Sequence, residues 1–240
     1  MAAASEPDSR VVELCGIGRM PVPAGFDTTA SDGTPAPPNP LIDYAVQAAR
    51  PRFQAVLRAG NAADRAAGLL MNFDMVPDAS GRVDVPRPLL TLALQVRNPR
   101  ILAAAMGQCA RDAADGRCAA VARAWTGFEP DNAAAWLALQ GADPTATPDA
   151  LRGLASANRH QLHYGWLAAQ VQARMPADIP AYVQMLLTIE AIGREAAFSV
   201  PPMQPLLALC RDAARGGEGM QAACTRLADV MRTIPTPWSG

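Results

Sequence analysis

The sequence contains no lysine, so all 21 of its basic residues are arginine. A genome rich in G and C is enough to explain this bias. The chemical consequence is strict, because several kinds of catalytic site and one common phosphate-binding loop require the lysine amine. Schiff-base catalysis, a P-loop lysine and a Ser–Lys dyad are therefore excluded.

Aromatic and charged residues are also scarce. Aromatics make up 5% of the chain and charged residues 18%, against 50% hydrophobic residues, among which alanine is abundant. Because alanine is the best helix former and a poor strand former, this composition favours closely packed helices over sheets. We therefore predict a globular all-α protein. The net charge of −1 argues against a nucleic-acid partner, which requires a basic face.

The chain also lacks a long apolar segment. No apolar run reaches the ~18 residues expected of a transmembrane helix, which predicts no membrane span. The first seven residues, Met-Ala-Ala-Ala-Ser-Glu-Pro, have neither the basic nor the apolar region of a signal peptide. Two interpretations stay open: a cytosolic protein with free thiols, or an exported protein whose native signal is not part of this sequence. Its cysteines favour export.

Four of the five cysteines form two closely spaced pairs. Cys109 and Cys118 flank a Gly-containing turn between two helical stretches, and Cys210 and Cys224 flank another. Each spacing fits a disulfide across a helical hairpin, and disulfides indicate an oxidising compartment such as the bacterial periplasm or the cell exterior. Closing loops this short stabilises a fold by roughly 2–3 kcal/mol each.

Proline content divides the chain near residue 40. Residues 1–40 are predicted to form an extended Pro/Gly-rich arm, in which the apolar segment 11–18 fits either a strand or a groove. Residues 41–240 are predicted to form a single α-helical domain, because apolar residues recur there at helical spacing. The helices are expected at 41–59 with a break near Pro51, 61–74, 87–96, 99–112, 117–127, 131–141, 148–158, 160–174, 178–198, 202–214 and 218–233.

The two cysteine segments also repeat each other. Arg-Asp-Ala-Ala occurs just after Cys109 and again directly after Cys210. Beyond the second cysteine of each pair, the apolar positions align as well. Two copies of one stapled hairpin predict an irregular array of antiparallel helical hairpins rather than a closed bundle.

The first hairpin has a spacing that is found in a known repeat. Pro130 is followed six residues later by Trp136 and three further by Leu139. Over 99–141 the chain thereby resembles a tetratricopeptide repeat, a helix pair of about 34 residues. The resemblance places Cys118 and Cys109 at the small and aromatic positions that face each other in that family. It implies stacked hairpins with a concave, protein-binding face and no chemistry of its own. The chain departs from the family after Leu139, and the period does not continue.

His160 and His163 are the only histidines. On a helix over 160–174 they share one face at a spacing suited to a metal ligand pair. No glutamate of a zincin motif accompanies them, and no Gly-x-Ser-x-Gly motif supplies a nucleophile. Cys15, the odd cysteine, lies in the predicted arm beside no histidine. Asp78 to Gly81 lacks the ligand spacing of a calcium loop. We therefore predict no catalytic residues, no metal site and no cofactor.

The segment around the histidines is also rich in residue types that dominate protein interfaces. Arginine, tyrosine and tryptophan carry much of the binding energy at such sites. The candidate partner-binding residues are Arg159, His160, His163, Tyr164 and Trp166. For Trp125 and Trp136 we expect packing between adjacent hairpins.

These features together predict an exported or periplasmic protein-binding module. A specific form is an inhibitor or immunity protein that neutralises a toxic enzyme delivered to the same compartment, by analogy with other helical inhibitors. The alternatives are a scaffold for envelope assembly, a hydrolytic enzyme using His160 and His163, and a purely structural protein. The identity of the partner and the oligomeric state are open.

Overall fold

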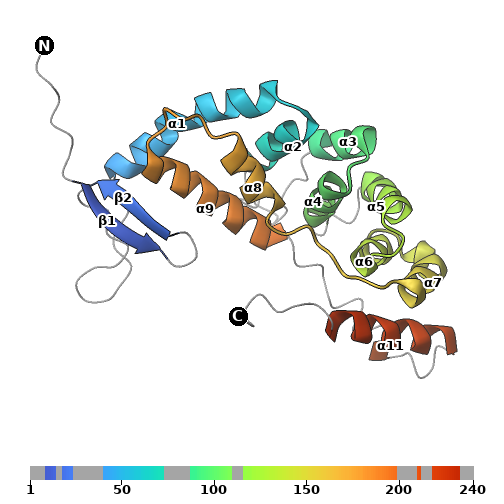
Figure 1. The fold of residues 1–240 in the computed structure, drawn as a ribbon. Coiled ribbons are helices and arrows are strands. Elements are labelled where there is room, and N and C mark those ends of the chain that lie inside the picture. Colours follow the sequence, from blue (N-terminus) through green and yellow to red (C-terminus); the bar gives the residue numbers. More distant parts are fainter. Residues whose placement is uncertain are drawn as a thin grey trace, which may run out of the picture. The chain divides into compact units, whose positions relative to one another are not determined.

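The computed structural model describes residues 9–14, 18–23, 40–72, 87–109, 116–198, 210–211 and 218–232. The chain groups into two compact units, one made of 1–68 with 168–192 and the other of 69–167 with 193–240. Apart from one two-stranded hairpin, the regular structure of the described residues is helical, which confirms the all-α prediction (Figure 1). The predicted division into an arm and one helical domain stays a prediction.

The first unit contains the strand hairpin. β1 (Ser9–Leu14) pairs antiparallel with β2 (Gly18–Pro23). Val22 of β2 is buried and packs with residues of α1 (Pro40–Ala59) and α9 (Ala181–Phe198), among them Ile42 and Met185. Within the predicted arm, residues 11–14 of the apolar segment thus lie in β1, and β2 packs on helices through Val22.

Helix α1 shows one error of the sequence analysis. The predicted break near Pro51 is wrong, because the helix continues through this residue to Ala59. A proline removes one backbone donor, and packing on both sides holds the helix together. Phe53 and Leu57 are buried beyond the proline, and before it Arg50 donates to both carboxylate oxygens of Glu190 on α9.

A buried carboxylate joins two further helices of this unit, α2 (Ala62–Met71) and α8 (Trp166–Ala173). Asp64 of α2 is fully buried and accepts hydrogen bonds from Gln170 and, at 2.8 Å, from Nε of Arg174. It also accepts from the backbone N–H of Asn61, whose own side chain caps the start of α2. The charge of Asp64 is therefore compensated inside the unit.

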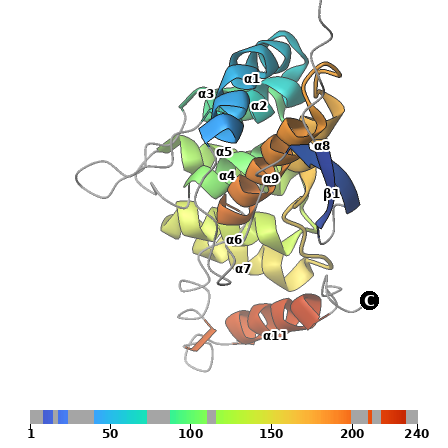
Figure 2. The same ribbon diagram turned by 90° about the vertical axis from the view of Figure 1, so that its left-hand side faces the viewer.

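The second unit is a series of short helices that pack in chain order. It contains α3 (Arg87–Val96), α4 (Pro99–Cys109), α5 (Gly116–Phe128), α6 (Ala133–Ala142), the 3₁₀ turn η1 (Pro144–Ala146), α7 (Thr147–Ser156) and α11 (Glu218–Arg232). Each of α3 to α6 contacts the next helix, and α7 contacts α11 (Figures 1 and 2). The α-helices of this unit, α3 to α7 and α11, begin within two residues of the predicted starts. None of the helices described in either unit is long and apolar enough to span a bilayer.

Both predicted disulfides are present. The Sγ atoms of Cys109 and Cys118 are 2.10 Å apart, which links α4 to α5, and those of Cys210 and Cys224 are 2.11 Å apart. Cys109 and Cys118 are both buried. Each bridge joins residues close in sequence, so it stabilises a local hairpin.

Some predictions fall outside the described residues. They concern the thiol of Cys15, the irregular stretch 75–86 with Asp78 to Gly81, and most of the helix expected at 202–214. Another prediction is wrong: α8 begins at Trp166, so the helix expected from residue 160 starts six residues later. Asp178 also does not open α9, which begins at Ala181.

The core between α6, α7 and α11 depends on one close approach. The indole of Trp136 lies directly on the backbone of Gly153, where an added Cβ would be 2.0 Å from a ring carbon. Its Nε1 donates to the carbonyl of Pro130 at 2.7 Å. Around it, buried side chains such as Leu137, Leu154 and Leu227 form the cluster. This contact confines position 153 to glycine.

Gly153→Ala is therefore expected to lower the free energy of unfolding by at least about 2 kcal/mol through overpacking against Trp136. Gly193→Ala is the matched control, since a Cβ at this exposed position of α9 meets nothing within 4 Å. It should raise stability by roughly 0.5–1 kcal/mol, because alanine is the better helix former. Urea denaturation of both variants measures the difference. Equal effects would contradict the close packing at Gly153.

Alkylation of the unreduced protein is expected to label at most one of the five cysteines, because four are held in disulfides. Reduction in denaturant should make all five reactive. The mass of the intact protein counts the labels in each state. Five labels without reduction would contradict both bridges and remove the support for an oxidising compartment.

Candidate binding loop

The segment from Ala157 to Gly165, here the 157–165 loop, connects α7 to α8 and is not helical. Its backbone is bonded to the α5–α6 connection. The carbonyl of Asp131 accepts from the N–H groups of Asn158 and Arg159 at 3.0 and 3.2 Å, and the Arg159 carbonyl accepts from Ala133 at 2.8 Å. These long-range bonds use backbone N–H and carbonyl groups that would otherwise form the hydrogen bonds within a helix. The shared helix face of His160 and His163 is therefore a wrong prediction.

The side chain of Asn132 forms two hydrogen bonds to the backbone of the loop. It is fully buried, and its Oδ1 accepts from the N–H of Gln161 at 2.9 Å and from that of Ala134 at 3.1 Å. Its Nδ2 donates to the carbonyl of Gln161 at 2.9 Å and to Glu129 at 3.0 Å. One amide thus caps α6, as its position before an Ala-rich helix predicts, and fixes the loop as well.

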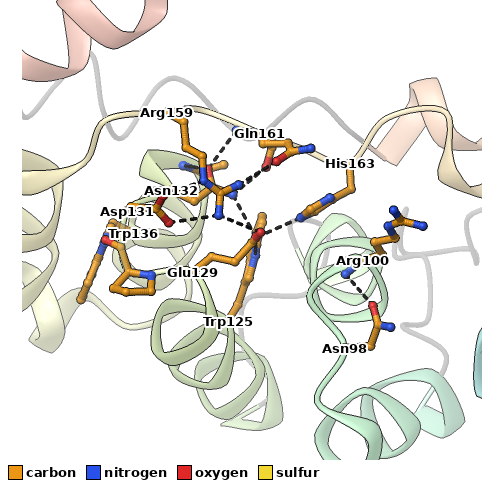
Figure 3. A network of polar contacts seen from close by, with 12 residues as sticks. Asn98, Arg100, Trp125, Glu129, Asp131, Asn132, Trp136, Arg159, Gln161 and His163 are labelled. Atoms are coloured by element: carbon orange, nitrogen blue, oxygen red, sulfur yellow. Dashed lines mark hydrogen bonds and ion pairs between the residues drawn. The ribbon is translucent and has the colours of Figure 1, made fainter.

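Glu129 is the centre of the network shown in Figure 3. Its carboxylate is buried, with 6% of the residue exposed. Oε2 accepts from Nε1 of Trp125 at 2.6 Å and lies 2.9 Å from Nε2 of His163, which must carry the proton because an ionised carboxylate only accepts. Oε1 accepts from Nη2 of Arg159 at 2.9 Å. With Asn132, which also donates to Oε2, three donors meet Oε2 and one meets Oε1.

The donors determine the ionisation of Glu129. Burial opposes its charge and by itself raises its pKa. The hydrogen bonds from His163, Trp125, Asn132 and Arg159 outweigh burial and lower the pKa from 4.5 to about 2. The group is therefore a permanent anion at neutral pH, and each of its oxygens accepts at least one hydrogen bond. It serves to hold surrounding groups rather than to accept a proton.

Arg159 adds further bonds between the loop and the carboxylates of Asp131 and Glu129. Its guanidinium binds Asp131 in a bidentate manner, at 2.9 and 3.0 Å, and lowers the pKa of that carboxyl group. The same group donates to Glu129 and, at 2.7 Å, to the side chain of Gln161. Planar bidentate pairs of this kind fix geometry as well as charge. Arg159 thus links both carboxylates to the loop.

The loop contains strained backbone. His163 has a φ of 57° and Gly165 a φ of 87°, both in the left-handed region. For a residue with a Cβ this conformation costs about 1–2 kcal/mol, whereas glycine adopts it readily. The bond from His163 to Glu129 compensates the strain at that residue. The two positive φ values form the turn that ends the loop and starts α8.

The structure separates the five predicted partner-binding residues. Tyr164 is 58% exposed, whereas Trp166 is 8% exposed and belongs to the core. Arg159 and His163 are committed to the Glu129 network. His160 is partly buried, burial lowers its pKa, and its Nε2 has no hydrogen-bond partner among the described residues. Tyr164 is therefore the large aromatic side chain that the loop exposes.

The sequence analysis missed the residues that hold this loop. Neither Glu129 nor Asn132 is among the candidate residues that the sequence analysis names. A usable signal was the polar run Glu129-Pro-Asp-Asn132 between two apolar helices, which calls for partners elsewhere in the chain. In the described part of the chain, no three His, Cys, Asp or Glu side chains lie together as metal ligands. What the arrangement can do is hold a loop in one conformation.

Replacing Glu129 with Gln should lower the free energy of unfolding by about 3–5 kcal/mol, because it removes one partner of a buried charge network. Asp149→Asn is the control, since Asp149 is exposed and pairs with Arg152 on the surface of α7. That change should cost less than about 1 kcal/mol. Urea denaturation at neutral pH measures both, and a small effect at Glu129 would contradict its central role.

The stability of the wild-type protein should also depend on this group at acidic pH. Because the folded pKa of Glu129 is about 2 and its ordinary value 4.5, its contribution is present above pH 4.5 and is lost as the pH falls toward 2. That contribution is on the order of 3 kcal/mol. Other carboxylates titrate in this range, so the measured quantity is the difference between wild type and Glu129→Gln. The difference should shrink between these pH values, and a constant difference would contradict the assignment.

Comparisons with known proteins add no evidence about function. No protein-family model matches the chain, and neither the curated proteins nor the solved structures contain a significant match.

Proposed function

We propose that this chain is an exported protein-binding module that contacts its partner through Tyr164 and the 157–165 loop. The observation that carries the proposal is the combination of an exposed aromatic side chain with a backbone fixed by a buried network. Tyrosine is enriched at binding hot spots because it offers a large apolar face and a polar tip.

The rigidity of the loop supports binding rather than simple packing. Association must offset the ordering of loops and side chains at an interface, and a loop held in one conformation avoids part of that loss. Here the backbone of Asn158, Arg159 and Gln161 is already bonded to the α5–α6 connection. The left-handed conformation of His163 is maintained although it is strained, which is typical of functional loops.

The specific form that we propose is a periplasmic inhibitor or immunity protein. Two disulfides support an oxidising compartment. Inhibitors that bind enzymes tightly usually keep their interface backbone nearly unchanged on binding, and the 157–165 loop has the bonds for such behaviour. Its partner would be a toxic enzyme or an envelope protein, which affinity capture would identify.

We also propose a tetratricopeptide-like arrangement for α4 to α7. Its support is that consecutive helices pack in chain order and that α3 also contacts α5 and α4 also contacts α6. The disulfide between Cys109 and Cys118 lies where that family packs an aromatic residue on a small one. In such an array each hairpin is buried by its neighbours, and loops at the hairpin ends are free to bind.

Affinity capture from an extract of the source organism under non-reducing conditions tests the proposal. The chain offers a matched pair of variants, because Tyr164 and Tyr44 are both exposed tyrosines, at 58% and 74%, on different parts of the fold. Tyr164→Ala should reduce retention of a stoichiometric partner by about tenfold or more, as expected for a hot-spot residue. Tyr44→Ala should retain it like wild type.

Equal retention by the Tyr164 variant would contradict the role of the loop, and the lack of any stoichiometric partner would contradict the binding function. A catalytic activity abolished by replacing His160 or His163 would replace the proposal with the enzymatic alternative. Both variants must keep the wild-type unfolding midpoint, which is expected because neither tyrosine is buried.

A further inference from the structure

Two arginines flank the connection between α3 and α4: Arg97 follows the end of α3, and Arg100 lies in the first turn of α4. Arg97 and Arg100 are exposed, and neither forms an ion pair within the part of the chain that the structure describes. Figure 3 shows Arg100 beside His163, on the side of the histidine that faces away from Glu129. The α3–α4 turn carries no carboxylate of its own, since it reads Arg97-Asn-Pro-Arg100.

Arg97 has an unfavourable backbone conformation for an arginine. It follows the last residue of α3, its N–H donates to the carbonyl of Ala93 at 2.9 Å, and its φ is 53°. This is the left-handed position after a helix, which glycine usually occupies. Among the described residues, positive φ occurs at Arg97, His163 and Gly165, which lie on the α3–α4 connection and in the 157–165 loop. Strained residues concentrate at functional surfaces.

The charges around the loop leave these arginines uncompensated. The nearby carboxylates, Glu129 and Asp131, are both bonded to Arg159, and Glu129 also accepts from His163. Among the described residues, the charges of these two carboxylates are thus used in internal pairing. The positive charge of Arg97 and Arg100 remains exposed to solvent or to a partner.

We propose that Arg97 and Arg100 form, with Tyr164, a docking surface for an acidic segment of a partner protein. The inference rests on the proposed binding function and names the chemistry of its partner. Two guanidinium groups suit carboxylates, which they bind through paired donors, and Tyr164, the exposed residue that follows His163 in the chain, would supply an apolar contact. A nucleic acid fits less well, because it requires a more extended basic surface than two side chains provide.

Fluorescence anisotropy of the full chain with labelled peptides tests the inference. The probes are an oligoglutamate peptide carrying one tryptophan, a Gly/Ser peptide of equal length with the same tryptophan, and an oligothymidylate of equal charge. The oligoglutamate should bind more tightly than the other two. Its affinity should fall as salt is added, because screening weakens exposed charge pairs.

The double variant Arg97→Gln/Arg100→Gln should weaken oligoglutamate binding by about tenfold, the effect of losing two charge contacts at an interface. Arg123→Gln/Arg152→Gln is the control, since both arginines are well exposed at 58% and 75% elsewhere in the same unit. The control should stay close to wild type. Equal losses in both variants, equal binding of the three probes, or tighter binding of the oligothymidylate would overturn the acidic partner.

Arg97→Gly separates binding from folding. Glycine relieves the left-handed strain, so the midpoint of thermal unfolding should rise while oligoglutamate binding falls. A rise in stability with unchanged binding would remove Arg97 from the surface. If partner capture depends on Tyr164 but not on the arginines, the binding function stands and the acidic chemistry of the partner is wrong.

Discussion

The buried carboxylate of Glu129 is the interaction on which the arrangement of the second unit around the loop depends. Its donors come from three segments: Trp125 from α5, Asn132 from the start of α6, and Arg159 with His163 from the 157–165 loop. A buried charge without donors would be strongly unfavourable, so the segments must be in place together. Loop, helix cap and helix end therefore form one cooperative structure rather than three local ones.

This arrangement explains how a protein with few aromatics and few charges can present a defined surface. Its polar groups are used inside, where the carboxylate of Glu129 and the amide of Asn132 order the loop. The apolar contacts lie elsewhere, at Gly153 and Trp136 and in the cluster between α6, α7 and α11. Packing builds the frame in this way, and hydrogen bonding sets the conformation of the loop attached to it.

The contrast between local and long-range interactions also decides what the sequence predicts. Helix α3, the cap at Asn132 and the disulfide of Cys109 with Cys118 depend on residues close in sequence, so spacing and residue type reveal them. The loop does not, because Arg159 is bonded to Asp131 across 28 residues and His163 to Glu129 across 34. The sequence analysis assigned residues 160–174 to one helix, so it did not recognise that the residues before Trp166 form a loop. At Pro51 the opposite occurred, since burial of Phe53 overrides a local signal that normally ends a helix.

The strained positions connect stability to the surface that we propose. A glycine at 97 or 163 would adopt its backbone angle without the penalty of a Cβ, yet the chain has arginine and histidine there. For His163 the structure contains the compensation, a bond to a buried carboxylate that only a side chain can make. For Arg97 the compensation within the described residues is the backbone bond to the carbonyl of Ala93, and its side chain has no ion pair or hydrogen bond among them. A contact made outside this chain would supply what is missing, and that is the physical reason for placing a partner at this turn.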